Sequence, residues 1–245
     1  MARTEQTWAE REYTLALLVL TAATGAVDGV SYLALDRVFT GNMTGNVLFI
    51  GFGIVGVAGI PVLNNLVALL AFLLGAALGS RITRRGAAAS GGVRLPRSSM
   101  WVQLVAVVGV FALAGVWFGV GRLGPTVMVV LTGVLALLLG AQASAVKHTG
   151  IRDLSTVVVT MTMVNLAADS RLAGGAGAAW FRRVGAIVTM GLGALAAAAV
   201  IRHLGGPYAL LLAGVLMAVG TLLLLRARQA DGRYAGASAE VVPPA

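Results

Sequence analysis

One acidic residue lies inside the first long apolar segment of the chain. Asp28 stands in the run TGAVDGVS, which covers residues 24–31. A carboxylate within an apolar membrane segment is costly and normally faces a cavity or a partner group. We therefore expect Asp28 to exchange a proton or bind a cation. The alternative is a neutral or paired carboxyl group that hydrogen-bonds the bend that follows.

That bend is a polar stretch, FTGNMTGNVL, at residues 39–48. Asn42 or Thr44 is suited to cap a helix, and Gly45 permits a close backbone approach. A helix that starts at membrane depth offers free N–H groups and a partial positive charge, which favour an anion or a carboxylate. The alternative is that Asn42, Thr44 and Asn46 only satisfy the backbone of a tight turn.

The second half of the chain offers a weaker set of polar side chains. Gln142 and Ser144 end one apolar segment, and Thr160 and Thr162 stand in a later, short one. Such hydroxyl groups often bond only the preceding helical turn. Placed opposite Asp28, however, they would complete a polar site near the membrane midplane for a small solute or ion.

The chain offers few residues for catalysis or for metal and cofactor binding. It has no cysteine, and its two histidines lie in different regions with no ligand spacing around them. Its many glycines lie in apolar segments, so they form no phosphate-binding motif. We therefore predict no metal, no cofactor and no enzymatic activity.

The elements that carry these residues must be membrane helices. The 245 residues are 58% hydrophobic and 11% charged, with a mean hydropathy of +0.91. Soluble domains usually contain about 25% charged residues. The net charge of +9 comes from short arginine clusters between apolar runs, which indicates membrane topology rather than a nucleic-acid surface. We predict an all-α integral membrane protein whose principal partner is the lipid bilayer.

Eight apolar segments are apparent, near residues 13–35, 44–58, 62–81, 100–120, 125–146, 155–168, 180–202 and 206–226. Most have roughly 20 residues or more, enough to cross a hydrocarbon core of about 30 Å. The segments 44–58 and 155–168 would make helices of only roughly 21–23 Å. These two are either tilted crossings or half-helices that enter and leave the membrane on one side.

The basic residues favour half-helices. With six crossings and a cytoplasmic N-terminus, fifteen of the eighteen lysines and arginines lie inside, and only Arg37, Arg122 and Arg202 lie outside. With eight crossings they divide nine against nine. The positive-inside rule therefore favours six transmembrane helices with both termini in the cytoplasm. Asp36, beside Arg37, is expected at the outer surface.

The order of segments also predicts two inverted repeats. A shift of about 116 residues carries Asp28 to Ser144 and Thr44 to Thr160. Repeat one is then about 13–120 and repeat two about 125–226, within one membrane domain at 1–226. Inverted repeats with broken helices are typical of transporters. We expect residues 81–97 to form a flexible connector and 227–245 a disordered cytoplasmic tail.

The motifs VFTGNMTGN and TGAVDGVSYLAL give the chain a resemblance to the YoaK family of bacterial multi-pass membrane proteins. The resemblance extends over nearly the whole chain in length and hydropathy. It implies an acidic residue in the first span followed by a TGN signature, and it implies no established activity. In the second half the family tends to show a Gln-Asn pair and a second Thr-Gly signature. Here Ala143 follows Gln142, and Met161 follows Thr160.

These observations lead to two functional hypotheses. The first is a secondary transporter or channel-like permease for a small solute or ion, with Asp28 as the coupling group. The second is a membrane protein that transports nothing, such as an assembly factor or a sensor, in which the polar groups are structural. Association into a homo-oligomer is compatible with either hypothesis.

Overall fold

Helices make up almost all of the part of the chain that the computed structural model describes, which is residues 2–87, 95–147, 159–175 and 179–240. Eight of these helices are α-helices, and no strand occurs within those ranges. In chain order they are α1 (Ala2–Ala34), α2 (Met43–Ile54), α3 (Val62–Ala87), α4 (Arg97–Val120), α5 (Pro125–Val146), α6 (Val159–Ala168), α7 (Trp180–His203) and α8 (Gly206–Glu240). A short 3₁₀ turn, η2 (Arg171–Ala173), follows α6.

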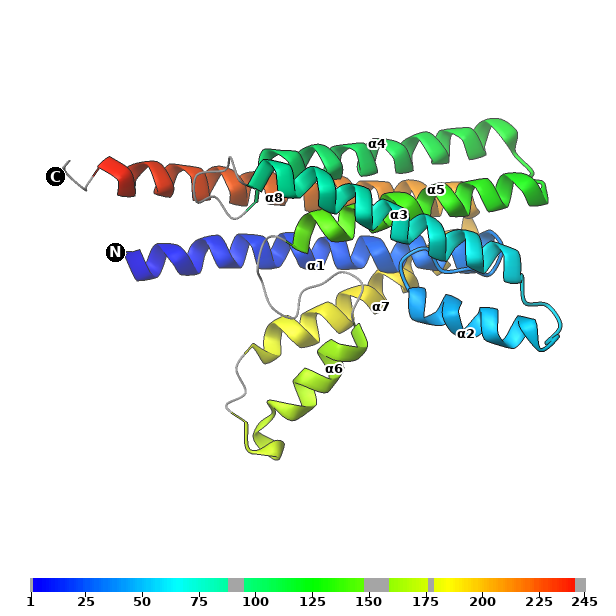
Figure 1. Ribbon diagram of the computed structural model, residues 1–245, viewed down its shortest axis with the longest axis horizontal. Coiled ribbons are helices and arrows are strands. Elements are labelled where there is room, and N and C mark those ends of the chain that lie inside the picture. Colours follow the sequence, from blue (N-terminus) through cyan, green and yellow to red (C-terminus); the bar gives the residue numbers. More distant parts are fainter. Residues whose placement is uncertain (1, 88–94, 148–158, 176–178, 241–245) are drawn as a thin grey trace.

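Six of the described helices are long and apolar enough to span a membrane, which confirms the prediction of a multi-pass helical membrane protein. They are α1, α3, α4, α5, α7 and α8. The other two, α2 with 12 residues and α6 with 10, are shorter. At about 1.5 Å per residue they measure roughly 18 and 15 Å, well below the thickness of a hydrocarbon core. The start of α1 and the end of α8 lie at the same end of the bundle (Figure 1).

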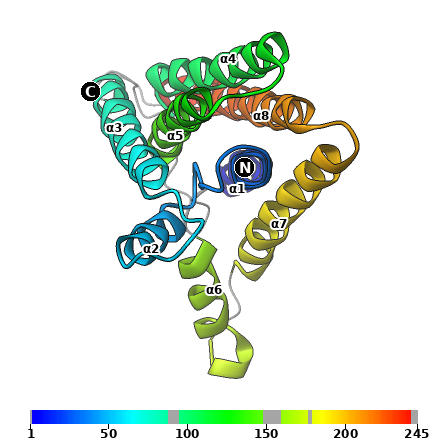
Figure 2. The same ribbon diagram turned by 90° about the vertical axis from the view of Figure 1, so that its right-hand side faces the viewer.

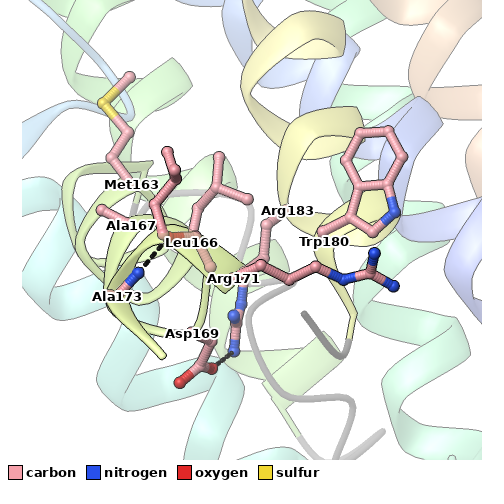
Figure 3. Close-up of a pocket in the computed structure, with 10 residues that line it drawn as sticks. Met163, Leu166, Ala167, Asp169, Arg171, Ala173, Trp180 and Arg183 are labelled. Atoms are coloured by element: carbon pink, nitrogen blue, oxygen red, sulfur yellow. Dashed lines mark hydrogen bonds and ion pairs between the residues drawn. The ribbon is translucent and has the colours of Figure 1, made fainter. Parts of the chain in front are cut away.

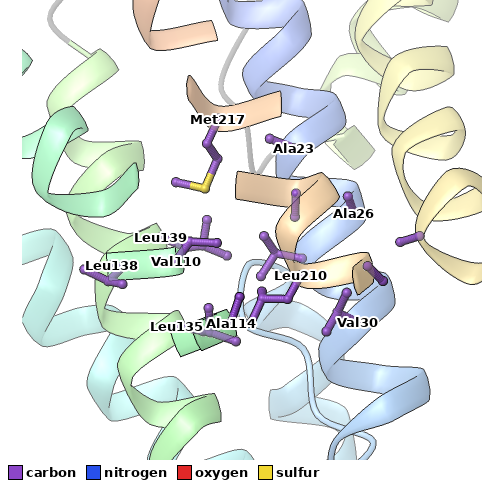
Figure 4. Packing of buried hydrophobic residues seen from close by; sticks show 14 of the residues in the cluster. Ala23, Ala26, Val30, Val110, Ala114, Leu135, Leu138, Leu139, Leu210 and Met217 are labelled. Carbon is purple, nitrogen blue, oxygen red and sulfur yellow. The ribbon is translucent and has the colours of Figure 1, made fainter. Parts of the chain in front are cut away.

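The first helix lies at the centre of the bundle, with the other long helices around it (Figure 2). Of its most apolar window, 72% is buried, against 17–50% for the other five spans. The largest core cluster joins α1, α4, α5 and α8 through small residues and leucines (Figure 4). Alanines recur there because membrane helices gain stability from close packing, the surrounding lipid being as apolar as their side chains.

The closest helix pairs are α1 with α7 and α3 with α5. In the first pair, Gly25 of α1 lies against the main-chain carbonyl of Met190, and Gly193 of α7 lies against that of Ala22. A methyl group at either glycine would overlap the opposing backbone. Gly29, one turn beyond Gly25, packs on the same helix. The spacing of these glycines therefore serves close helix packing, as small residues commonly do in membranes.

The α3–α5 pair is built in the same way. Gly75 of α3 lies against the main-chain carbonyl of Leu137, and Gly140 of α5 lies against that of Phe72. Around these two pairs, α8 packs on α1 and α4 packs on α5, while α4 and α8 contact each other. The short helices lie outside this core, α2 against α3 and α6 against α7.

The last helix continues beyond the end that we expected at residue 226. It runs to Glu240, so the described part of the tail is helical rather than disordered. Ala227 is fully buried, Arg228 donates from Nε to the main-chain oxygen of Leu95 at 2.9 Å, and Tyr13 donates its hydroxyl to Asp231 at 2.9 Å. The alanine- and arginine-rich composition suits a helix. Residues 88–94 of the expected connector and 241–245 of the tail lie outside the described residues.

The packing of α7 on α1 predicts different effects for two neighbouring glycines. Gly193→Ala should destabilise the protein by about 1–3 kcal/mol, because a rigid carbonyl cannot move aside for the methyl group. Gly191→Ala should leave stability unchanged or slightly raised, because its Cβ would meet nothing within 4 Å. Thermal unfolding of the purified variants in detergent measures both. Equal melting temperatures would rule out this packing.

Candidate functional site

Asp28 is hydrogen-bonded to the loop between α1 and α2. This loop, residues 35–42, doubles back along α1, so that Thr40 and Gly41 lie beside a residue well before the end of that helix. The main-chain N–H groups of Thr40 and Gly41 donate to Asp28 Oδ1 at 2.9 and 2.7 Å, and the Thr40 hydroxyl lies 3.3 Å from the same oxygen. One carboxylate oxygen therefore serves three donors at the start of α2.

The second oxygen of Asp28 is in a different position. Oδ2 is buried and has no hydrogen-bond partner among the described residues, and the whole side chain is only 6% exposed. Gly41 packs so closely that a methyl group there would lie 3.3 Å from Oδ2. A buried charge without compensation is unfavourable. The free oxygen is thus the least satisfied polar atom of the loop region.

Asp28 lines a cavity of about 470 Å³ between α1, the 39–42 stretch and α7. Its walls are mostly apolar, and they contain no lysine, arginine or histidine among the described residues. Leu33 and Leu195 on its rim are 55% and 65% exposed, so the cavity opens sideways on the outer face of the bundle. The lining residues are Gly25, Asp28, Gly29, Tyr32, Leu33, Phe39, Asn42, Met190, Gly191, Ala194, Leu195 and Ala198.

Two aromatic rings form part of this wall. Tyr32 and Phe39 stack on each other, with ring centroids 4.9 Å apart and an angle of 13° between the planes. Phe49 of α2 packs on both rings at 6.3 and 6.0 Å. The aromatic group therefore joins α1, the loop and α2 next to the carboxylate.

Asn46 holds the same loop from the other side. Its side-chain Nδ2 donates to the main-chain oxygen of Phe39 at 2.6 Å, and its Oδ1 accepts from the Phe39 N–H at 3.0 Å. Asn46 is fully buried. Both polar groups of one peptide residue are thus satisfied by a single side chain, which is the structural alternative that the sequence left open for this asparagine.

The other predicted residues of the stretch divide into two groups. Asn42 caps α2, accepting from the Gly45 N–H at 3.3 Å, and it also lines the Asp28 cavity. Thr44 is exposed and does not line that cavity. At Gly45 a methyl group would overlap the Phe39 ring, so this glycine permits the turn to pack.

Asp36 connects the loop to two further helices. It accepts from Asn64 of α3 at 2.7 Å and from Thr132 of α5 at 2.9 Å. Burial raises the pKa of the Asp36 carboxyl above its ordinary value, while these two hydrogen bonds lower it in part. Asp36 is therefore partly buried and connects the loop to α3 and α5.

The second-half residues lie elsewhere, and none of them lines the Asp28 cavity. Gln142 is buried in α5 and accepts through its main-chain oxygen from Gln103 of α4 at 3.3 Å. Ser144 bonds the preceding turn at Ala141, 2.8 Å away. On α6, Thr160 is exposed and Thr162 is buried. The polar side chains of the two halves do not meet around Asp28.

A second cavity, of about 900 Å³, lies between α6, η2 and α7 (Figure 3). Arg183 of α7 forms an ion pair with Asp169 at 2.6 Å and donates to the main-chain oxygen of Asn165 at 2.8 Å. These contacts fix the end of α6 on α7. This second cavity is open and largely apolar, with Trp180 and Leu172 on its rim.

Several residues that line the Asp28 cavity were not predicted from the sequence. Tyr32 and Phe39 resembled ordinary packing aromatics, and only their positions, one turn after Asp28 and just before the TGN stretch, offered a signal. Met190 and Ala194 lie more than 160 positions from Asp28 in the chain. Nothing in one sequence indicates that α7 packs on α1.

Comparison with known proteins places the chain among membrane proteins without an assigned activity. A family model described as a protein of unknown function (DUF1275) matches residues 16–223. The chain is similar to the UPF0700 transmembrane protein YoaK of Bacillus subtilis (strain 168), with 30% identity over 168 residues, 66% of this chain and 68% of the relative. No solved structure matches.

Asn46 offers a test of the loop anchor. Asn46→Ala should lower stability by about 2–4 kcal/mol, because it leaves the partly buried N–H and C=O of Phe39 unpaired. Thr44→Ala, on the exposed face of the same helix, should change stability by less than about 0.5 kcal/mol. Thermal or denaturant unfolding in detergent gives both values. The anchor is refuted if the two variants are equally stable.

Proposed function

We propose that this chain, which belongs to the YoaK-like family of transmembrane proteins of unknown function, is a secondary transporter or channel-like permease rather than an enzyme. The proposal rests on Asp28. One oxygen of this carboxyl group accepts hydrogen bonds from the loop before α2, and the other is buried without a described partner. The side chain lines a cavity that opens on the side of the bundle.

This arrangement links occupancy of the cavity to the position of the loop. The bonds from Thr40 and Gly41 to Oδ1 are stronger while the carboxylate is charged, since charge-assisted hydrogen bonds are about twice as strong as neutral ones. A proton or cation at Oδ2 neutralises the group and weakens those bonds. The loop and the start of α2 are then less firmly held. Such a ligand-dependent bias between two arrangements is what coupling requires.

We further propose that α2 and α6 are half-helices. The loop before α2 returns to the depth of Asp28, and α2 then runs back toward the end of the bundle at which α1 ends (Figure 1). The N-terminus of α2 follows the irregular chain of residues 35–42. Within a membrane such chain is tolerated where protein side chains satisfy it, as Asp28 and Asn46 do here.

The helix pairs support two inverted repeats. If each of α1–α4 corresponds in order to one of α5–α8, the contact between α1 and α7 corresponds to the contact between α5 and α3. The contact between α2 and α3 likewise corresponds to that between α6 and α7, and the contact between α4 and α8 corresponds to itself. The backbone contacts follow the same exchange. In each helix the glycine follows the contacted carbonyl by three positions: Ala22 and Gly25, Phe72 and Gly75, Leu137 and Gly140, Met190 and Gly193.

These pairs give shifts of 115 residues from Gly25 to Gly140 and 118 from Gly75 to Gly193, close to the 116 inferred from hydropathy. With a shift of 115, Asp28 corresponds to Ala143 rather than to Ser144. The second repeat then has no carboxylate at the matching position. We accordingly place the coupling group in the first repeat alone.

The non-transporting hypothesis keeps one observation in its favour. Asp28 and Asn46 bond the loop, and Asp36 connects the loop to α3 and α5, which a purely structural role also requires. That role gives no reason for an unpaired Oδ2 beside a cavity. Transport measurements on an Asp28 variant therefore separate the two hypotheses.

Asp28→Asn should abolish solute-evoked, pH-dependent currents in proteoliposomes on a solid-supported membrane, tested with a panel of cationic, neutral and anionic solutes. The amide still accepts at Oδ1 but cannot take up a proton or neutralise a cation. Asp169→Asn, which removes a carboxylate from the other cavity, should keep the currents. Currents of wild-type size and pH dependence in Asp28→Asn would contradict the coupling role.

The topology can be tested with single cysteines, since the chain has none of its own. We expect cysteines replacing the exposed residues Ala58 and Arg122 to react with an impermeant maleimide from outside the cell. A cysteine replacing Leu172, which is fully exposed after α6, should react only from the cytoplasmic side. Labelling of Ala58→Cys from the cytoplasm alone would exclude α2 as an outer half-helix.

A further inference from the structure

We infer that the Asp28 cavity binds a small organic monocation, an ammonium group carried on an apolar body. The inference rests on the proposed function for its biological meaning, since it names the class of solute that the permease would take. The binding chemistry is argued from the residues that line the cavity, which are one carboxylate, the amide of Asn42 and otherwise aromatic and aliphatic groups.

The charge of the ligand follows from Asp28. Oδ2 is buried and has no described partner, and no basic residue is found among the described lining residues. A cation would supply the missing counter-charge, whereas an anion would meet the carboxylate with nothing to offset the repulsion. The Oδ1 atom is already engaged by Thr40 and Gly41. Oδ2 is thus the one carboxylate oxygen of Asp28 that is left to pair with a positive charge.

The residues that line the cavity indicate which type of cation it binds. A hydrated metal ion needs several oxygen ligands, but the lining offers few polar groups near Asp28. Tyr32 and Phe39 border the cavity next to the carboxylate, and aromatic rings attract alkylammonium groups. Met190, Ala194 and Leu195 supply apolar surface on the α7 side. Carboxylate, aromatic rings and apolar wall together suit an organic amine.

The size and opening of the cavity agree with this class. A volume of about 470 Å³ falls in the usual range for small-molecule sites, roughly 300–1,000 Å³. The rim of the cavity is exposed and apolar at Leu33 and Leu195. A ligand with an apolar body can enter from there. The ammonium group could belong to a free amine or to a lipid headgroup, which share this chemistry.

The test is calorimetric titration of the purified protein in nanodiscs made only of phosphatidylglycerol, which has no ammonium group. The probe is benzyltrimethylammonium, compared with the anion phenylmethanesulfonate and the neutral benzyl alcohol. Saturable binding is expected for the cation alone. In nanodiscs that contain phosphatidylethanolamine, weaker apparent binding of the probe identifies a headgroup as the occupant, and unchanged binding identifies a free amine.

Variants separate the charge from the aromatic wall. Asp28→Asn should weaken cation binding more than tenfold, while Asp169→Asn, outside the cavity, should leave it unchanged. Tyr32→Phe keeps the ring and should bind as the wild type does, whereas Tyr32→Leu should bind about 2- to 30-fold more weakly. If Asp28→Asn fails to fold, the two Tyr32 variants still test the site.

Each failure has its own meaning. Equal binding of the anion or the alcohol, or no effect of Asp28→Asn and Tyr32→Leu, overturns the cation assignment. Asp28-dependent currents evoked only by neutral or anionic solutes overturn it too, yet leave the permease intact. Cation binding with no current from any solute overturns the permease and supports the cation site.

Discussion

The structure depends on how a non-helical stretch of backbone is satisfied inside an apolar bundle. Each N–H or C=O group buried there without a partner costs free energy, and lipid supplies none. Two side chains solve this at residues 39–41: Asp28 accepts from Thr40 and Gly41, and Asn46 bonds both polar groups of Phe39. Because these bonds hold the chain at the depth of Asp28, α2 can begin there. The cavity exists beside α7 because the loop forms one of its walls.

Much of the fold could be predicted from the sequence, because membrane helices follow directly from hydropathy. The six long spans lie close to the expected segments, and the two short segments became the short helices α2 and α6. The predicted end of the last helix was wrong, because Ala227 and Arg228 pack on partners that composition does not reveal. The pairing of helices could not be predicted either, since contacts such as that of Gly25 with Met190 join residues far apart in the chain.

The site was predictable in part. Asp28, Asn42 and Asn46 were recognisable because polar residues are rare in apolar segments, and all three do organise the loop. The roles of these residues could not be predicted, since a hydrogen bond to the backbone and a contact to a ligand use the same side-chain atoms. Gln142, Ser144, Thr160 and Thr162 were grouped with them by analogy between the two halves. None of them lines the Asp28 cavity. Gln142 and Ser144 lie on α5, which packs on α3 and α4, and the two threonines lie on α6, which packs on α7.

The central position of α1 has a consequence for biosynthesis. This helix leaves the ribosome before the other described helices, but its main neighbours, α7 and α8, begin only at Trp180 and Gly206. At about 5–20 residues per second, α7 is complete roughly 10–30 s after α1. During that interval Asp28 and the glycine face of α1 have no α7 to cover them. The least apolar of the six spans, with a mean hydropathy of 1.5, must therefore wait in the membrane or at the insertion machinery until the last helices arrive.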